Sequence, residues 1–258
     1  MSAPASAVQR VASQAGFETR TLVSNGEQLL VSIVLPVLVL VGLALSAVPD
    51  VSNGPWSSLT RLEVIAPGVL ALAVVSTAFT GQAILLGYER RYGVLRLLGT
   101  TPLGPGGLLL GKALAVLVVI TVQVSVLSAV AASLGWRPRL SGIPVALVLL
   151  LAGAAAFVAL AVLLGGTLRA EAVLALANLI WVLLLALGGI VLPAAALPGP
   201  GWLADAVTWL PSALLADGLR VALSGVSDGI PTALRVAALL GWTLLLGWPA
   251  ARLLRWSD

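Results

Sequence analysis

The chain has 258 residues, of which 60% are hydrophobic and 9% are charged, and its formal net charge is +4. This composition excludes an ordinary soluble domain and favours a single domain that lies mostly in a lipid bilayer. Because histidine and cysteine are absent, the commonest metal ligands, the thiol nucleophile and the usual acid–base group near neutral pH are missing, which disfavours most catalytic classes.

The N-terminal segment, residues 1–27, lacks the apolar core and cleavage site of a signal peptide. Apolar residues recur in it near helical spacing, at Val8, Val11, Ala12, Ala15 and Leu22. This pattern predicts a cytoplasmic helix that lies in the membrane interface, and a disordered tail is the alternative.

Six segments are apolar and long enough, at roughly 20 residues each, to cross a bilayer. They cover about residues 29–48, 64–88, 108–134, 143–168, 172–192 and 232–254. The sequence therefore predicts an all-α integral membrane protein with about six transmembrane helices, in one transmembrane domain over residues 1–258.

Basic residues are divided unequally between the two ends of these spans. One end carries Arg10, Arg20, Arg90, Arg91, Arg96, Lys112, Arg169, Arg252 and Arg255. The other carries Arg61, Arg137, Arg139, Arg220 and Arg235. The positive-inside rule places the first end, with both termini, in the cytoplasm. The basic residues are too scattered to predict a nucleic-acid surface.

The second and third spans are joined by a loop, residues 89–107, that begins with the densest charge cluster of the chain. The charged residues are Glu89, Arg90, Arg91 and Arg96. The apolar residues Val94, Leu95, Leu97 and Leu98 leave Arg96 on another face, which predicts a short amphipathic helix along the cytoplasmic surface.

Turn-forming residues flank this short helix on both sides. Gly93 allows the bend into it, and Thr101 and Pro102 end it, because proline lacks an amide hydrogen and disfavours helix in the preceding residue. The glycines within residues 104–107 are expected to loosen the entry into the third span.

Residues 104–113, GPGGLLLGKA, contain the G-x-x-x-x-G-K pattern of a phosphate-binding loop. Ala113, however, stands where that loop needs a Ser or Thr hydroxyl for magnesium, and an apolar span follows, so we do not expect this chain to bind ATP. Lys112 is instead expected to extend its ammonium group towards lipid headgroups. Gly107 and Gly111 form a G-x-x-x-G pattern that allows close helix packing.

Polar residues within the spans fall at helical spacing. They form the sets Thr77 and Thr80; Thr121, Ser125 and Ser128; and Asn178 alone. Each set could line a translocation path, although hydrogen bonding between packed helices is the commoner role of such residues. No chain of carboxylates crosses the spans, which disfavours a proton-driven pump.

Residues 193–231 are too apolar for an ordinary loop, yet they are interrupted by Pro193, Pro198, Pro200 and Pro211. This pattern predicts short external re-entrant helices before the last span, beside the external end of a pathway. Asp217 and Arg220 are three residues apart, so they can pair on one helix, and a stabilising pair is favoured over a substrate contact.

Two of these regions together resemble the membrane permease subunits of ABC type-2 exporters. The coupling region of that family is matched by Glu89, Arg90, Gly93, Leu95, Leu97, Leu98, Thr101, Pro102, Gly111 and Lys112. Its external element before the last span is matched by Leu210, Pro211 and Arg220. Val94 and Arg96 depart from the family pattern, which often has threonine and an acidic residue at these positions.

The resemblance implies that the short helix docks into a separate ATP-binding subunit and transmits its motion to the spans. The coupling residues would be Glu89, Arg90, Arg91, Gly93, Val94, Leu95, Arg96, Leu97, Leu98, Thr101 and Pro102. This chain would hold no cofactor, since two copies of the partner ATPase would bind ATP and Mg²⁺. A second permease, identical or related, would complete an exporter of an unidentified amphiphilic substrate.

Under this reading the protein lies in the inner (plasma) membrane, and the use of arginine over lysine suggests a bacterial source. Three alternatives stay open at this point. The basic cluster could anchor the loop to anionic headgroups without any protein partner. The chain could be an ATP-independent channel or secondary transporter. A membrane-embedded enzyme ranks last. It would need ionisable groups clustered at one cavity, and the sequence has no histidine, no cysteine and no carboxylate pair at helical spacing within a span.

Overall fold

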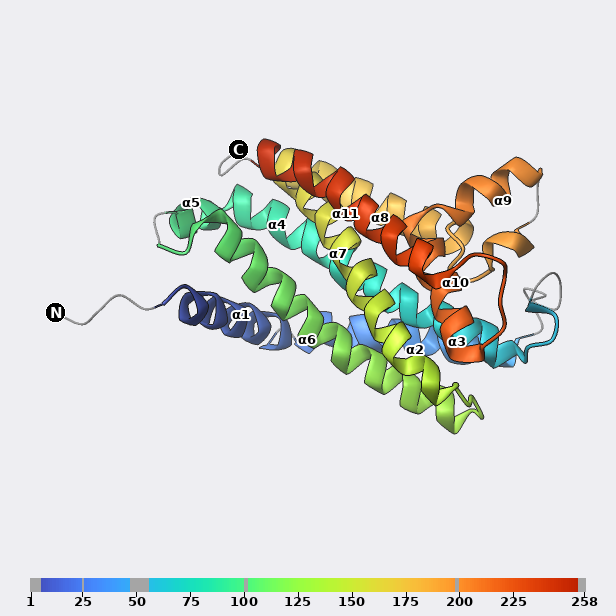
Figure 1. Ribbon diagram of the computed structural model, residues 1–258. Helices are drawn as coiled ribbons and strands as arrows, with labels where there is room; N and C mark the ends of the chain where they lie inside the picture. Colours follow the sequence, from blue (N-terminus) through green and yellow to red (C-terminus); the bar gives the residue numbers. More distant parts are fainter. Residues whose placement is uncertain (1–5, 25, 47–55, 100–101, 198–199, 255–258) are drawn as a thin grey trace.

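The computed structural model describes residues 6–24, 26–46, 56–99, 102–197 and 200–254. Over these ranges the chain forms a bundle of long helices without β-strands (Figure 1). Among the described residues, five helical rods are long and apolar enough to cross a membrane. They are the continuous rod Arg61–Arg91, α6 (Gly104–Ser133), α7 (Ile143–Thr167), α8 (Ala170–Leu187) and α11 (Thr232–Leu253). The predicted all-α integral membrane fold is therefore confirmed.

The rod Arg61–Arg91 is the innermost part of the bundle. It consists of α3 (Arg61–Val74), a π-helical stretch η2 (Val75–Gly81) and α4 (Gln82–Arg91). Residues 64–74 are all buried, as expected of a helix that is apolar on every side. Helices α2, α6 and α10 pack on α3, while α7 and α8 pack on α4.

The first expected span corresponds to α2 (Gly26–Leu45). Its described apolar stretch, Ser32–Leu45, is shorter than the other spans. Before it, α1 (Ala7–Ser24) confirms that the N-terminal segment is helical. The location of α1 in a membrane interface stays a prediction.

Helix α1 packs along the first part of α6. A Cβ atom added at Gly111 would lie 2.7 Å from the Gln14 side chain, and one added at Gly107 would lie 3.7 Å from that of Val11. The two glycines therefore permit the close helix contact that their spacing predicted, and the partner helix is α1.

Two helix boundaries differ from the expected ones. Helix α6 begins at Gly104, so residues 104–107 belong to its first turn, where a proline at position 105 is favourable. Helix α8 ends at Leu187 rather than near residue 192, because the chain turns at Gly189 with φ of +78°. That turn directs two backbone carbonyl groups into the bundle, as described below.

The two ends of the bundle are distinct (Figure 1). The α5 end carries α5 (Val94–Gly99), the start of α6 and the last turn of α11. The α10 end carries α9 (Gly201–Thr208) and α10 (Pro211–Ser224), together with the short 3₁₀ turns η3 (Leu140–Gly142) and η4 (Ala194–Ala196).

Helices α9 and α10 meet at a bend of 83°. This arrangement confirms the expected short helices before the last span, and their external, re-entrant location stays a prediction. Trp202 and Trp209 are exposed at α9 and the bend, whereas α10 is buried along most of its length between α3, α7 and α11. The second helix of the pair is therefore a component of the core.

Candidate functional site

The loop at the α5 end reverses the chain between α4 and α6. Helix α4 ends at Arg91, and Gly93 has φ of +74°, a left-handed conformation that favours glycine. Helix α5 follows at once and occupies the segment where a short amphipathic helix was expected. The predicted bend and short helix are therefore both present.

The apolar side chains of this loop point in opposite directions. Leu95 is fully buried in a cluster with Leu86 and Leu108, so it holds α5 against the bundle. Leu97 is 70% exposed and Tyr92 is 72% exposed. The expected single apolar stripe is therefore divided, because residues two apart on a helix lie on opposite faces.

Other coupling residues lie partly outside the described structure. Thr101 falls there, as do the side chains of Arg96 and Leu98. Pro102 is described and exposed, and its carbonyl oxygen accepts a hydrogen bond of 2.5 Å from Nη1 of Arg10 on α1. The end of the loop is thus connected to the N-terminal helix.

Lys112 forms the centre of a buried charge cluster that joins three helices. Its Nζ lies 2.7 Å from Oε1 of Glu89 on α4 and 2.8 Å from Oε1 of Glu18 on α1. Nε2 of Gln14 also donates to Glu18, at 2.8 Å. The expectation that Lys112 extends to lipid headgroups is therefore wrong. The ammonium group is instead paired with two carboxylates of the protein, which compensate for its burial.

The two arginines that follow Glu89 also bind within the protein. Arg90 is buried and donates to the carbonyl of Leu168, at the end of α7. Arg91 pairs with Glu171 in the first turn of α8. Headgroup anchoring therefore does not account for Arg90. The coupling loop is instead attached to α1, α6, α7 and α8.

The glycine-rich stretch that matched a phosphate-binding loop is helical. Residues 104–112 form the first turns of α6 and not a loop that surrounds a phosphate. The expectation that the stretch does not bind ATP stays a prediction.

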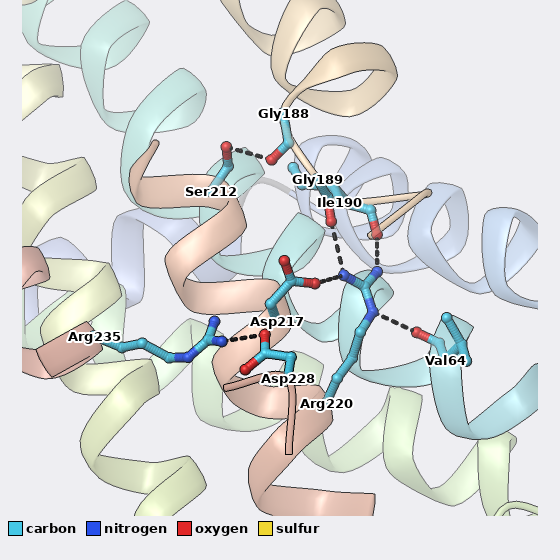
Figure 2. A network of polar contacts seen from close by, with 9 residues as sticks. All are labelled: Val64, Gly188, Gly189, Ile190, Ser212, Asp217, Arg220, Asp228 and Arg235. Atoms are coloured by element: carbon cyan, nitrogen blue, oxygen red, sulfur yellow. Dashed lines mark hydrogen bonds and ion pairs between the residues drawn. The ribbon is translucent and has the colours of Figure 1, made fainter. Parts of the chain in front are cut away.

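A second polar network lies at the α10 end, around Arg220 (Figure 2). The Arg220 side chain is completely buried and pairs with Asp217 at 2.6 Å, so the expected pair is present. Its Nε donates to the Val64 carbonyl of α3 at 2.9 Å, and its Nη1 to the Gly189 carbonyl at 2.8 Å. Nη2 donates to the carbonyl of Ile190.

Neighbouring contacts extend this network to the last span. Arg235 on α11 is also fully buried and pairs with Asp228, while Ser212 donates 2.7 Å to the Gly188 carbonyl (Figure 2). Pro211, which belongs to the predicted external element, is the first residue of α10. The network therefore fixes α10 to α3 and to the turn after α8, and the Arg235–Asp228 pair joins α11 to the loop that follows α10.

The polar residues of η2 contact two other spans. Thr77 donates 2.8 Å to Oε1 of Gln123 on α6, and Nε2 of Gln123 donates 3.0 Å to the Ser32 carbonyl of α2. Nε1 of Trp181 on α8 donates 2.8 Å to Ser76. Oγ1 of Thr80 is buried without a hydrogen-bond partner among the described residues. A π-helical stretch in a span often marks a functional region.

The remaining polar residues of the expected path lie apart from η2. Thr121, Ser125 and Asn178 are exposed on the protomer surface, and each donates to a carbonyl one turn back in its own helix. Ser128 lines an apolar groove between α6 and α7. Within one chain, these residues do not converge with Thr77 on a single cavity.

Some groups in these polar contacts were not predicted as site residues. They are Glu18, Gln123 and the carbonyl acceptors of Arg220. Glu18 lies in the N-terminal segment, whose predicted helix rests on its apolar positions. The carbonyl acceptors have no side-chain signal, because every residue carries the same backbone oxygen.

These features define a polytopic membrane protein built as a helical bundle, with an anchored loop at one end and a bent helix pair at the other. The profile of the family described as "ABC-2 family transporter protein" matches residues 57–252, which is most of the chain. The chain belongs to this family and is the membrane-spanning permease subunit of an ABC transporter. No curated protein matches the chain.

Proposed function

We propose that this permease is the membrane half of an ATP-driven exporter, in which a separate subunit hydrolyses ATP. Two copies of that ATPase and a second permease, identical or related, complete the transporter. The second permease is proposed because a membrane subunit of this family works as half of a pair. The substrate is an unidentified amphiphilic molecule that leaves the cytoplasm.

One observation carries the proposal of an ATPase partner. The loop at the α5 end presents Tyr92 and Leu97 outward, and exposed large apolar side chains that lie together are typical of a contact surface. The same loop is rigidly held, since Leu95 is buried and Glu89, Arg90 and Arg91 are each paired with other helices. An exposed apolar surface on a rigid base can transmit a partner's movement to several spans at once.

The charge distribution supports a cytoplasmic location for the α5 end. Elements that begin or end there carry Arg10, Arg20, Arg90, Arg91, Arg96, Lys112 and Arg252, and Arg169 lies in the connection between α7 and α8. The α10 end carries Arg61, Arg137, Arg139, Arg220 and Arg235. The basic excess at the α5 end agrees with the positive-inside rule and with docking of a cytoplasmic ATPase in the plasma membrane of a bacterium.

The test is a pull-down of the full chain from its native host in mild detergent, followed by mass spectrometry. Wild-type protein should retain an ATPase that carries a phosphate-binding loop, and Leu97→Asp should lose it, because the charge would enter an apolar contact. Leu140→Asp is the matched control, since Leu140 is 75% exposed at the opposite end of the bundle.

The results distinguish the exporter proposal from the choice of Leu97 as a docking residue. If Leu97→Asp retains the ATPase, the docking residue is wrong. If wild-type protein retains no ATPase under any extraction that keeps the bundle folded, the exporter proposal is overturned and an ATP-independent channel or secondary transporter becomes the better candidate.

A further inference from the structure

An apolar groove of about 360 Å³ lies between α6, α7 and α11, in the half of the bundle nearer the α5 end. Helices α6 and α7 are joined by a short connection at the α10 end and diverge from there (Figure 1). The groove follows α7 from Leu151 to Val162, which is about 16 Å at 1.5 Å per residue. That length is close to one leaflet, or half of the roughly 30 Å hydrocarbon core.

The groove is open towards the bilayer. Leu110 and Leu151 line it and are each about half exposed. Its floor is made by small residues such as Ala154 and Ala155 of α7. The hydroxyl of Thr243, also on its wall, is bonded to the Leu239 carbonyl, so the groove offers no polar group to a ligand there.

The neighbouring face of α11 is also apolar. It carries Leu244, Leu245 and Trp248, which are all exposed, and it borders the groove at Thr243 and Gly247. Gly247 lacks a side chain, so no large side chain stands between this face and the groove at that point. An apolar groove beside an exposed apolar helix face suits the two acyl chains of a phospholipid.

A cation lies beyond the end of this apolar face. The guanidinium of Arg252, one turn beyond Trp248, lies 4.0 Å from the centre of the Trp248 ring. This cation–π contact positions the charge but uses none of its N–H donors. Arginine donors suit phosphate oxygens, and tryptophan is typical of the headgroup level of a membrane.

We propose that α6, α7 and α11 form a binding site for an anionic phospholipid of the surrounding bilayer. One acyl chain lies in the groove between the three helices, the other lies along Trp248, and Arg252 binds the phosphate. The site does not depend on the ATPase partner or on the direction of transport, so it can be tested independently of both.

The test is native mass spectrometry of the purified full chain, titrated with phosphatidylglycerol and with phosphatidylcholine of the same acyl chains. Wild-type protein should bind phosphatidylglycerol about fivefold more tightly, the effect expected of one cation near an anionic headgroup. Arg252→Gln should remove this preference. Ala155→Leu, which fills the first groove, should weaken binding of both lipids severalfold.

Matched controls distinguish lipid binding at this site from lipid binding elsewhere on the protein. Arg137→Gln removes an exposed arginine at the other end, and Ala175→Leu enlarges an exposed alanine on α8, so neither should change lipid binding. Equal binding of the two lipids by wild-type protein, or an equal loss in Arg137→Gln and Arg252→Gln, would overturn the proposal.

A single cysteine tests whether another copy of the chain covers the groove instead. The natural sequence has no cysteine, so Ala155→Cys introduces the only thiol. The variant should form no disulfide-linked dimer under oxidising conditions in native membranes. A high yield of disulfide-linked dimer would show that the groove is an interface between chains, and the lipid site would be wrong.

Discussion

Lys112 of α6 and Glu89 of α4 are joined by an ion pair of 2.7 Å whose side chains are only 5% and 14% exposed. The same ammonium group contacts Glu18 of α1 at 2.8 Å. The three residues therefore hold the N-terminal helix, the coupling loop and α6 in one arrangement. Because the cluster is buried, loss of its cation leaves two carboxylates without compensation.

Lys112→Met is expected to destabilise the protein by about 3 kcal/mol, the lower end of what breaking a buried pair usually costs. The measurement is thermal unfolding in detergent, followed by tryptophan fluorescence. Adding Glu18→Gln to Lys112→Met should recover part of the loss, because one uncompensated charge is removed. If the two substitutions were simply additive, the ion pair would not contribute in this way.

Arg220→Lys is expected to be strongly destabilising even though the charge is kept. A lysine cannot reach the carbonyls of Val64, Gly189 and Ile190 together with Asp217, since it lacks the planar fork of donors. We expect a loss of about 3 kcal/mol or more, as for other disrupted buried pairs. Arg137→Lys, at an exposed position, should leave the melting temperature unchanged.

Gly68→Ala tests the same network through packing. A Cβ atom at this position would lie 2.2 Å from the Ile190 carbonyl oxygen and 2.6 Å from Nη2 of Arg220. Overpacking of this kind costs about 1–3 kcal/mol and should lower the melting temperature. Gly42→Ala, in α2 with open space around it, should instead be neutral or stabilising by roughly 0.5–1 kcal/mol through helix propensity. Equal effects of the two substitutions would contradict the close approach at Gly68.

Leu95 and Leu97 should respond differently to the same substitution. Leu95→Asp places a charge in the cluster with Leu86 and Leu108, so it should loosen α5 and increase amide hydrogen exchange there. Leu97→Asp lies on the exposed side and should leave exchange and thermal stability almost unchanged. Protection lost to the same extent in both variants would mean that the two leucines share one face.

Local patterns were sufficient to predict much of the fold. Apolar runs gave the long helices, since a span needs a set number of residues to cross hydrocarbon. Gly93 and Pro102 indicated the short helix between them, and the three-residue spacing of Asp217 and Arg220 indicated their pairing. The end of α8 was missed, because the turn at Gly189 is needed by Arg220, which lies 31 residues further along the chain.

The sequence by itself determined the class of the protein, its helical spans and the short helix after Gly93, because hydrophobic periodicity and turn chemistry act between residues close in the chain. Tertiary structure alone decided which charges pair between different helices. Lys112 was expected at the headgroups, yet it meets Glu18 and Glu89 from two other helices. Whether a charge faces lipid or a buried partner depends on how distant helices pack, and spacing along one helix carries no record of that packing.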